Sequence, residues 1–341
     1  MNRWRCGAVA TMALVAAVGG TPVAAQSRSG QGLSRSGFPG TVAQRAPGGF
    51  GKANTRATAA AGGCGAVRLG QTTVAAPGNT LIVTLLANET PLTLLLDTGA
   101  EATILTPAAA QRVGAQSPRV EFQRQMRGVG GSLQTSEVEL RSFTVGGVAI
   151  PWRRVRVAPV CVAGLFSRPL DGVLGADSLS SFDVDLDLPN NRITFYGKQT
   201  CPGAVPTWTE PYVTIAAGRS RGDRLFFPVQ LDGRKIDAFV DTGAQSTVLS
   251  TGAALGLGVT TALMARDRAA ILRGAAGEQV DGRVHRFARL NVGAEAIYNP
   301  EMIVTDFWLN DADLVLGINF LKPRRIWLSY GSQQIFLLRR T

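Results

Sequence analysis

Three observations predict an all-β protein with two similar lobes. The 341 residues include 40 Gly and 17 Pro but only 7% aromatic residues, which is typical of short strands joined by tight turns. From Val67 onward the chain consists of short β-rich runs broken by Gly, Pro and Asn. One segment then occurs a second time, and an internal repeat indicates a duplicated structural unit. With 45% hydrophobic residues, the chain can form a core in each unit.

The repeat begins with an apolar strand that runs into the sequence Asp-Thr-Gly-Ala. The first copy joins residues 92–96 to Asp97–Ala100, and the second joins residues 236–240 to Asp241–Ala244. In both copies a polar residue and an apolar β segment follow. A strand that ends in a polar turn is common, but two matching copies are a specific signal.

The two copies stay similar beyond this motif. A Val-Leu-Gly sequence ends at Gly175 in the first copy and at Gly317 in the second, nearly the same distance after the aspartate. We expect short helices at residues 176–182 and 318–321, and strands at residues 192–196, 325–328 and 334–338. The lobes are therefore expected at residues 64–203 and 204–341.

Residues 1–25 have the features of a secretory signal peptide. Arg3 and Arg5 precede an apolar run over residues 8–18, and small residues up to Ala25 offer a cleavage site. The run is too short and too rich in Ala and Gly to stay as a membrane anchor. We expect an exported protein, periplasmic or secreted, without an integral membrane segment after cleavage.

Residues 26–63 are expected to be a disordered tail. They are rich in Gly, Ser and Arg and hold too few apolar residues to offset the entropy of chain ordering. The net charge of +11 arises partly in this tail. No aromatic residues are interleaved with the basic ones, so we expect a solvated tail and no nucleic-acid partner.

Three cysteines remain after removal of the signal peptide: Cys64, Cys161 and Cys201. An odd number in an oxidising compartment indicates one disulfide and one thiol. Cys64 with Cys201 would tie together the ends of the first lobe, and Cys161 with Cys201 is the alternative. The sequence does not choose between them.

Other polar residues do not form a recognisable site. No Cys or His spacing resembles a metal site, and we expect neither a metal nor a cofactor. His285 lies in an alternating strand pattern and is expected at the surface. Four acidic residues near the end of the first lobe lack the pattern of a calcium loop and are expected to be solvated: Asp177, Asp183, Asp185 and Asp187.

The two Asp-Thr-Gly-Ala motifs resemble those of the pepsin and retroviral-type aspartic proteases, particularly the small bacterial retropepsin-like members. The resemblance covers nearly all of the chain beyond residue 67. It implies barrel-like acid-protease lobes related by a pseudo-twofold axis, with Asp97 and Asp241 facing each other at a cleft as the catalytic pair. Two carboxyl groups that close share one proton, so one can serve as general base and the other as general acid.

The resemblance also assigns roles to the residues beside the aspartates. Thr98 and Thr242 are expected to reach across to the opposite loop. Gly99 and Gly243 are expected to let the backbone approach closely and to direct N–H groups toward the carboxylates.

Ala100 and Ala244 complete the two motifs. Pepsin-like enzymes usually have Ser or Thr at these positions, whereas retroviral-type enzymes often have Ala. A hydroxyl group there would stabilise the charged pair, so its absence predicts a less acidic optimum. An activity maximum below about pH 3 would contradict this hypothesis.

Two glycine-rich hairpins are candidates for flaps that close over a bound peptide. The first contains Gly128, Gly130 and Gly131, and the second contains Gly274 and Gly277. An ordinary mobile turn is the alternative, especially for the second hairpin. Neither hairpin has the tyrosine of pepsin-like flaps, which agrees with the retroviral type.

The resemblance implies an aspartic endopeptidase that acts on polypeptides. A single chain holds both aspartates, so a monomer suffices. The main alternative is a catalytically inactive retropepsin-fold module that binds peptides or acts as a scaffold in the cell envelope. The sequence also allows an assembly that pairs lobes of different chains, and a zymogen in which residues 26–63 cover the cleft.

Overall fold

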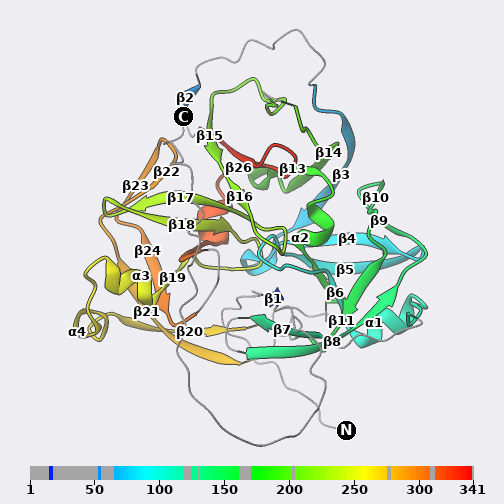
Figure 1. Ribbon diagram of the computed structural model, residues 1–341, viewed down its shortest axis with the longest axis horizontal. Coiled ribbons are helices and arrows are strands. Elements are labelled where there is room, and N and C mark those ends of the chain that lie inside the picture. Colours follow the sequence, from blue (N-terminus) through cyan, green and yellow to red (C-terminus); the bar gives the residue numbers. More distant parts are fainter. Residues whose placement is uncertain are drawn as a thin grey trace, which may run out of the picture.

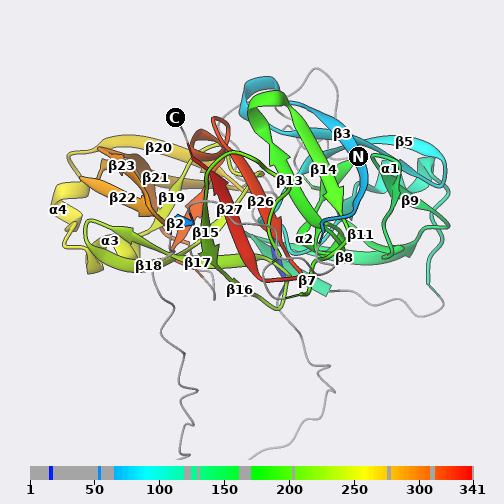
Figure 2. The ribbon, with the colours of Figure 1, turned by 90° about the horizontal axis from the view of Figure 1, so that it is seen from above.

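The computed structural model describes residues 65–118, 124–128, 131–160, 170–201, 204–274, 278–307 and 312–339, and the backbone of two short strands, β1 (Val15–Ala17) and β2 (Ala53–Asn54). Two β-rich lobes lie side by side, and a further group of strands joins them on one side (Figure 1). Seen from above, this group lies between the lobes (Figure 2). The predicted all-β, two-lobed fold is confirmed.

The N-terminal lobe contains nine strands and two helices with a 3-10 turn among the described residues: η1 (Pro77–Asn79), β4 (Ile82–Ala87), β5 (Thr90–Leu96), β6 (Ile104–Leu105), α1 (Pro107–Arg112), β7 (Arg124–Gly128), β8 (Gly131–Glu139), β9 (Phe143–Val145), β10 (Val148–Ala149), β11 (Arg154–Val157), β12 (Gly172–Leu174) and α2 (Ala176–Leu179). Strand β12 lies between β5, to which it is parallel, and β6, to which it is antiparallel.

The C-terminal lobe repeats this plan: β16 (Gly218–Arg219), β17 (Leu225–Leu231), β18 (Arg234–Val240), β19 (Val248–Ser250), α3 (Thr251–Gly256), α4 (Thr261–Met264), β20 (Arg268–Arg273), β21 (Gln279–Arg286), β22 (Arg289–Val292), β23 (Glu295–Tyr298), β24 (Glu301–Thr305), β25 (Leu314–Leu316) and α5 (Ile318–Leu321). Strand β25 is parallel to β18 and antiparallel to β19. The same three-strand arrangement thus occurs once in each lobe.

A sheet shared by both lobes joins them. Its strands are β3 (Arg68–Ala75), β13 (Asp183–Asp187), β14 (Arg192–Tyr196), β15 (Tyr212–Ala216), β26 (Arg325–Ser329) and β27 (Gln334–Leu338), and the 3-10 turn η3 (Leu188–Asn190) connects β13 to β14. The order is β3-β14-β13-β26-β27-β15, with β2 at the edge beside β15. Antiparallel pairing of β13 with β26 crosses from one lobe to the other. The sequence repeat did not predict this shared sheet.

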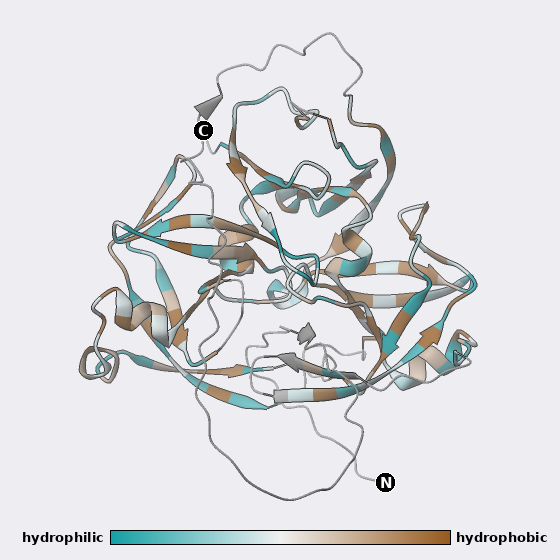
Figure 3. Ribbon diagram, viewed as in Figure 1, coloured by the Kyte–Doolittle hydropathy of each residue, from teal (hydrophilic) through white to brown (hydrophobic). Residues whose placement is uncertain are grey.

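Hydrophobic residues recur along the strands of both lobes, as Figure 3 shows. In β17 every second residue is buried, so one face of that strand packs into the core. The ends of β5 and β18 and all of β12 and β25 are buried continuously, because neighbouring strands and side chains enclose them on both faces. In each lobe, the end of the strand that leads to the aspartate and the strand beside it are therefore buried.

Each lobe extends one long hairpin. Strands β7 and β8 form the first, and β20 and β21 form the second. Figure 1 shows both at the bottom of the view, on the side opposite the shared sheet. Gly128 pairs with Gly131 at the end of the first hairpin, and Gly274 follows β20, whereas Gly130 and Gly277 lie outside the described residues.

The prediction that Asp183, Asp185 and Asp187 are solvated is wrong. Their exposed fractions are 0%, 1% and 2%. The backbone N–H of Gln199 donates to Asp183 (3.0 Å), and Trp208 Nε1 donates to Asp185 (3.2 Å). Asp183 accepts a hydrogen bond from Ser329 Oγ (2.9 Å), and Asp185 pairs with Arg325 (2.7 Å). Asp187 pairs with Arg192 of the neighbouring strand β14 (2.5 Å). Each buried carboxylate therefore has polar or charged partners, and those of Asp183 and Asp185 lie far away in the sequence.

The predictions for the N-terminal segments stay predictions. Of residues 1–63 only β1 and β2 are described, and these pair with β7 and β15. Cys201 is disulfide-bonded, while Cys64 and Cys161 lie outside the described residues, so both pairings remain open. In the part of the chain that is described, no helix has the length and apolar character to span a membrane.

Candidate active site

Asp97 and Asp241 lie at the ends of equivalent strands in the two lobes. Asp97 follows β5, and its backbone N–H donates to Leu174 O (3.0 Å). Asp241 follows β18, and its N–H donates to Leu316 O (3.0 Å). Both aspartates have an exposed fraction of 0%, and their carboxyl groups lie close enough for the charge of Asp241 to raise the pKa of Asp97. The structure thus brings together the two acidic residues that the repeat singled out.

Each carboxyl group is held by its own loop through Oδ1. The donors are the last two backbone amides of each motif: Gly99 (2.9 Å) and Ala100 (2.8 Å) for Asp97, and Gly243 (2.8 Å) and Ala244 (3.0 Å) for Asp241. Among the described residues, no group outside the pair donates to either Oδ2. Two carboxyl groups in contact repel each other unless a proton lies between them, so the pair is arranged to hold one.

Thr98 and Thr242 tie the two loops together. Thr98 Oγ1 donates to Val240 O (2.6 Å) and accepts from Thr242 N (3.1 Å). Thr242 Oγ1 donates to Leu96 O (2.8 Å) and accepts from Thr98 N (3.0 Å). Each hydroxyl group therefore satisfies two buried backbone groups of the opposite lobe.

Gly99 and Gly243 each lie against the aspartate of the other lobe. A methyl group added at Gly99 would overlap the carboxyl group of Asp241, and one added at Gly243 would overlap that of Asp97. A side chain at either position would separate the loops. Glycine is needed here for close approach.

The pKa values of both aspartates are raised, mainly by burial. Burial is the largest cause for Asp97, and the charge of Asp241 adds to it, so the pKa of Asp97 lies well above its usual range. Burial also raises the pKa of Asp241, to about 6, against the opposing effects of its hydrogen bonds and of the charge of Arg224. Near neutral pH the pair therefore retains a proton.

Arg224 and Glu101 form an ion pair between the lobes beside the aspartates. Arg224 Nη2 lies 2.8 Å from Glu101 Oε1, and the side chains are 4% and 10% exposed. The Arg224 guanidinium also lies over the Phe239 ring, 5.2 Å from its centroid. Neither charged residue was predicted as part of the site, although the charge of Glu101 breaks the repeat immediately after the first motif.

Comparison with known families assigns each lobe separately. Residues 83–178 match the aspartyl protease family, and residues 227–323 match the gag-polyprotein aspartyl protease family. The chain belongs to the retropepsin-like aspartyl proteases. Each matched range contains one Asp-Thr-Gly-Ala motif, so the retropepsin-like unit occurs twice in one chain.

Curated relatives match only part of this retropepsin-like chain. DNA damage-inducible protein 1 of Eremothecium gossypii is 35% identical over 99 residues, and UBA domain-containing protein Mud1 of Schizosaccharomyces pombe is 36% identical over 98 residues. Either match covers 29% of this chain, and 20% and 28% of the respective relatives. Among solved structures, an aspartic proteinase from Irpex lacteus is 15% identical with a TM-score of 0.46, covering 80% of this chain and 97% of that one.

A threonine behind each catalytic loop braces the retropepsin-like fold. Thr103 Oγ1 donates to Asp177 Oδ1 (2.7 Å), and Thr247 Oγ1 donates to Asn319 Oδ1 (2.9 Å). The prediction that Asp177 is solvated is wrong, because α2 turns its carboxylate toward Thr103 and burial raises its pKa. Its equivalent in the second lobe is a neutral amide.

Gly175 and Gly317 leave room for the chain beneath the catalytic loops. A methyl group at Gly175 would overlap the backbone of Ala102, and one at Gly317 would overlap that of Ser246. Gly175 and Gly317 precede α2 and α5, so these glycines allow each short helix to lie close to the loop.

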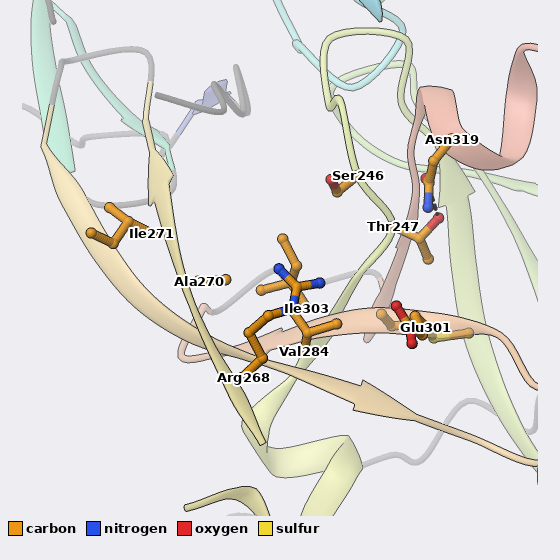
Figure 4. Close-up of a pocket in the computed structure, with 10 residues that line it drawn as sticks. Ser246, Thr247, Arg268, Ala270, Ile271, Val284, Glu301, Ile303 and Asn319 are labelled. Carbon is orange, nitrogen blue, oxygen red and sulfur yellow. Dashed lines mark hydrogen bonds between the residues drawn. The ribbon is translucent and has the colours of Figure 1, made fainter. Parts of the chain in front are cut away.

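A pocket of about 370 Å³ lies between the catalytic loop of the C-terminal lobe and the second hairpin (Figure 4). Its lining comes from the end of the loop, from β20, β21 and β24, and from α5: Ser246, Thr247, Arg268, Ala270, Ile271, Val284, Glu301, Met302, Ile303 and Asn319. Ala270, Val284 and Ile303 provide an apolar surface, and Arg268 and Glu301 provide charge. The second hairpin thus forms one wall of this pocket.

The equivalent positions of the N-terminal lobe are charged. Val284 pairs with Ile303 across β21 and β24, and Glu137 pairs with Arg156 at the matching place across β8 and β11. These positions are equivalent because Ile104 and Val248 lie the same number of residues after their aspartates. Ile104 pairs with Arg156 in the first lobe, and Val248 pairs with Ile303 in the second. The two halves of the cleft therefore differ in chemistry.

His285 is not a free surface residue. Its Nδ1 lies 2.7 Å from Asp267 Oδ2, and its ring packs edge-on against Phe287. The imidazole is 19% exposed and lies on β21, where it links the base of the second hairpin to the preceding turn.

We predict that Thr98→Val destabilises the protein by about 2–4 kcal/mol, because the valine leaves Val240 O and Thr242 N buried without a partner. Urea unfolding monitored by tryptophan fluorescence measures this loss. Thr98→Ser keeps the hydroxyl group and should cost much less. Equal losses in the two variants would contradict the role assigned to these hydrogen bonds.

We predict that Asp241→Asn stabilises the protein at pH 7 but not at pH 4. The asparagine keeps an oxygen for the Gly243 and Ala244 amides and offers an N–H to Asp97. The folded-state pKa of Asp241 is raised to about 6, so its stability contribution is present at low pH and is lost as pH rises through that value. Urea unfolding should show a gain of roughly 2–3 kcal/mol at pH 7. If the variant and the wild-type protein differed in unfolding free energy by a similar amount at both pH values, that result would contradict the raised pKa of Asp241.

Proposed function

We propose that this retropepsin-like protein is an aspartic endopeptidase that hydrolyses extended polypeptides. The observation that carries the proposal is the close approach of the buried carboxyl groups of Asp97 and Asp241, which lie between two loops locked by Thr98 and Thr242. The pocket that the second hairpin lines lies next to the loop that carries Asp241, and a hairpin in this position can enclose a peptide and exclude water.

The two aspartates can carry out hydrolysis by proton transfer alone. The ionised aspartate takes a proton from a water molecule as the water oxygen attacks the peptide carbonyl carbon. The protonated aspartate donates its proton to the carbonyl oxygen, which gives a tetrahedral diol. The first aspartate then protonates the amide nitrogen, the second takes a proton from a diol hydroxyl group, and the C–N bond breaks. Both aspartates return to their starting states.

We also propose that the protein acts as an exported monomer. The signal-like residues 1–25 support export to the periplasm or beyond. One chain provides both aspartates, which supports a monomeric enzyme. Sedimentation of the active protein tests its mass, and N-terminal sequencing of the protein from its own cells tests cleavage after Ala25.

We predict that Asp97→Asn and Asp241→Asn each lower kcat/KM by at least about a thousandfold, because one carboxyl group cannot serve as both acid and base. Cleavage of a peptide library by the mature protein measures this, with folding checked by circular dichroism. Asp232→Asn is the control, since Asp232 is exposed and Asn tolerates its left-handed backbone (φ 47°). Activity that survives either catalytic substitution would contradict the mechanism. A folded wild-type protein that binds but never cleaves peptides would indicate the inactive binding module.

We predict that kcat/KM falls as pH drops below about 6. Below the pKa of Asp241 both aspartates are protonated, and no base remains to activate water. A pH profile of peptide cleavage between about pH 3 and 8 measures this limb. A maximum below about pH 3 would contradict both the raised pKa values and the role assigned to Ala100 and Ala244.

We predict that the pocket beside the second hairpin accepts a large apolar side chain of the substrate. Ala270→Trp should fill it and lower kcat/KM on the order of tenfold for peptides with such a side chain, with little effect on peptides with a small one. Ala269→Trp is the matched control, because Ala269 is exposed on the other face of β20. An equal effect of both variants on both peptide classes would contradict the assignment.

A further inference from the structure

The sequence repeat is broken immediately after the catalytic motifs. Glu101 follows the first motif, and Gln245 follows the second. The partner of Gln245 is Thr80, and the partner of Glu101 is Arg224. Thr80 and Arg224 are different residues at equivalent positions, since Thr80 lies as many residues before Asp97 as Arg224 lies before Asp241. Glu101 pairs with Arg224 (2.8 Å), whereas Gln245 Nε2 donates to Thr80 Oγ1 (3.1 Å). One side of the pseudo-twofold axis therefore carries an ion pair, and the other side carries a neutral hydrogen bond.

The ion pair lies where its charges are weakly screened. Arg224 is 3% exposed, and Glu101 lies so close to Gly222 that a methyl group there would overlap the glutamate side chain. Contact with the Phe239 ring holds the guanidinium on the C-terminal lobe, to which Asp241 also belongs. Charges in such surroundings act over longer distances than charges in water.

We propose that the Arg224–Glu101 pair makes the two aspartates unequal, so that Asp241 holds the negative charge and Asp97 holds the proton. This inference rests on the function proposed above. It assigns activation of the water to Asp241 and protonation of the carbonyl oxygen to Asp97. Arg224 and Glu101 act through the aspartates and are positioning residues.

The groups that face each aspartate support this assignment. Among the described residues, the groups that most affect the pKa of Asp97 are Asp241 and the amides of Gly99 and Ala100. None of them is a cation. Asp241 accepts hydrogen bonds from two amides of its own loop, and the Arg224 guanidinium lies over the ring of Phe239, two residues before Asp241. The guanidinium lowers the pKa of Asp241, while the negative charge of Asp241 raises that of Asp97.

Carbon NMR of protein labelled with ¹³C at the aspartate carboxyl groups tests the inference without any measurement of cleavage. Asp97→Asn and Asp241→Asn each leave one carboxyl group of the pair, and the Asp97→Asn/Asp241→Asn double variant identifies its signal by difference. We expect Asp241 alone to titrate about one pH unit or more below Asp97 alone. After addition of Arg224→Gln and Glu101→Gln to both single variants, most of that difference should disappear.

Three variants control for structural effects. Arg224→Lys keeps the positive charge and should preserve the difference in pKa, and Thr80→Val removes the neutral equivalent and should also preserve it. If the Arg224→Gln/Glu101→Gln protein does not fold, Glu101→Gln alone decides, because it leaves the cation unopposed and should widen the difference. Equal pKa values in the two single variants, or a difference unaffected by the charge changes, would overturn the inference. Unequal pKa values in a protein that cleaves nothing would overturn the proposed function alone.

Discussion

The rest of the structure depends on the contact between two buried carboxyl groups. Burial and mutual repulsion both oppose ionisation of Asp97 and Asp241, so the folded chain must hold them together against a considerable free-energy cost. The four hydrogen bonds of Thr98 and Thr242 and the shared β13–β26 pairing provide that restraint. The same cost keeps a proton on the pair, and that proton is what general acid–base chemistry requires.

Duplication places the two aspartates, and departures from duplication make them different. The backbone around each motif is nearly the same, since the amide donors, the threonine hydrogen bonds and the strand pairings all occur twice. The side chains that differ are next to this framework. Glu101 and Arg224 form an ion pair where the other half of the site has the neutral pair Gln245 and Thr80. Val284 and Ile303 of the C-terminal lobe are apolar where the N-terminal lobe has the charged pair Glu137 and Arg156. A repeated backbone thus supports two unlike halves of a site.

The sequence predicted the parts of the fold that local pattern determines. Apolar strands that run into Asp-Thr-Gly-Ala located Asp97 and Asp241, and the later strands lie within one residue of their expected bounds. The shared sheet could not be predicted, because its central pairing joins Asp185 to Trp327, residues far apart in the sequence. For the same reason Asp183 and Asp185 looked solvated, since Ser329 and Arg325 are distant partners. The partner of Glu101 likewise lies in the other lobe, and no local pattern marks it.

The presence of both lobes in one chain explains why the site can have a direction. In a symmetric homodimer the two halves of a cleft have the same sequence, so a peptide could bind equally well in either direction. Here Val284 and Ile303 give the pocket beside the second hairpin an apolar surface, while Glu137 and Arg156 occupy the equivalent positions of the first lobe. A peptide is asymmetric, and only an asymmetric cleft can distinguish its ends. If a peptide binds in one direction only, the same aspartate always approaches its carbonyl oxygen and the other always approaches the water. The difference between the two halves of the site and the proposed difference between the two aspartates would then contribute to the same reaction.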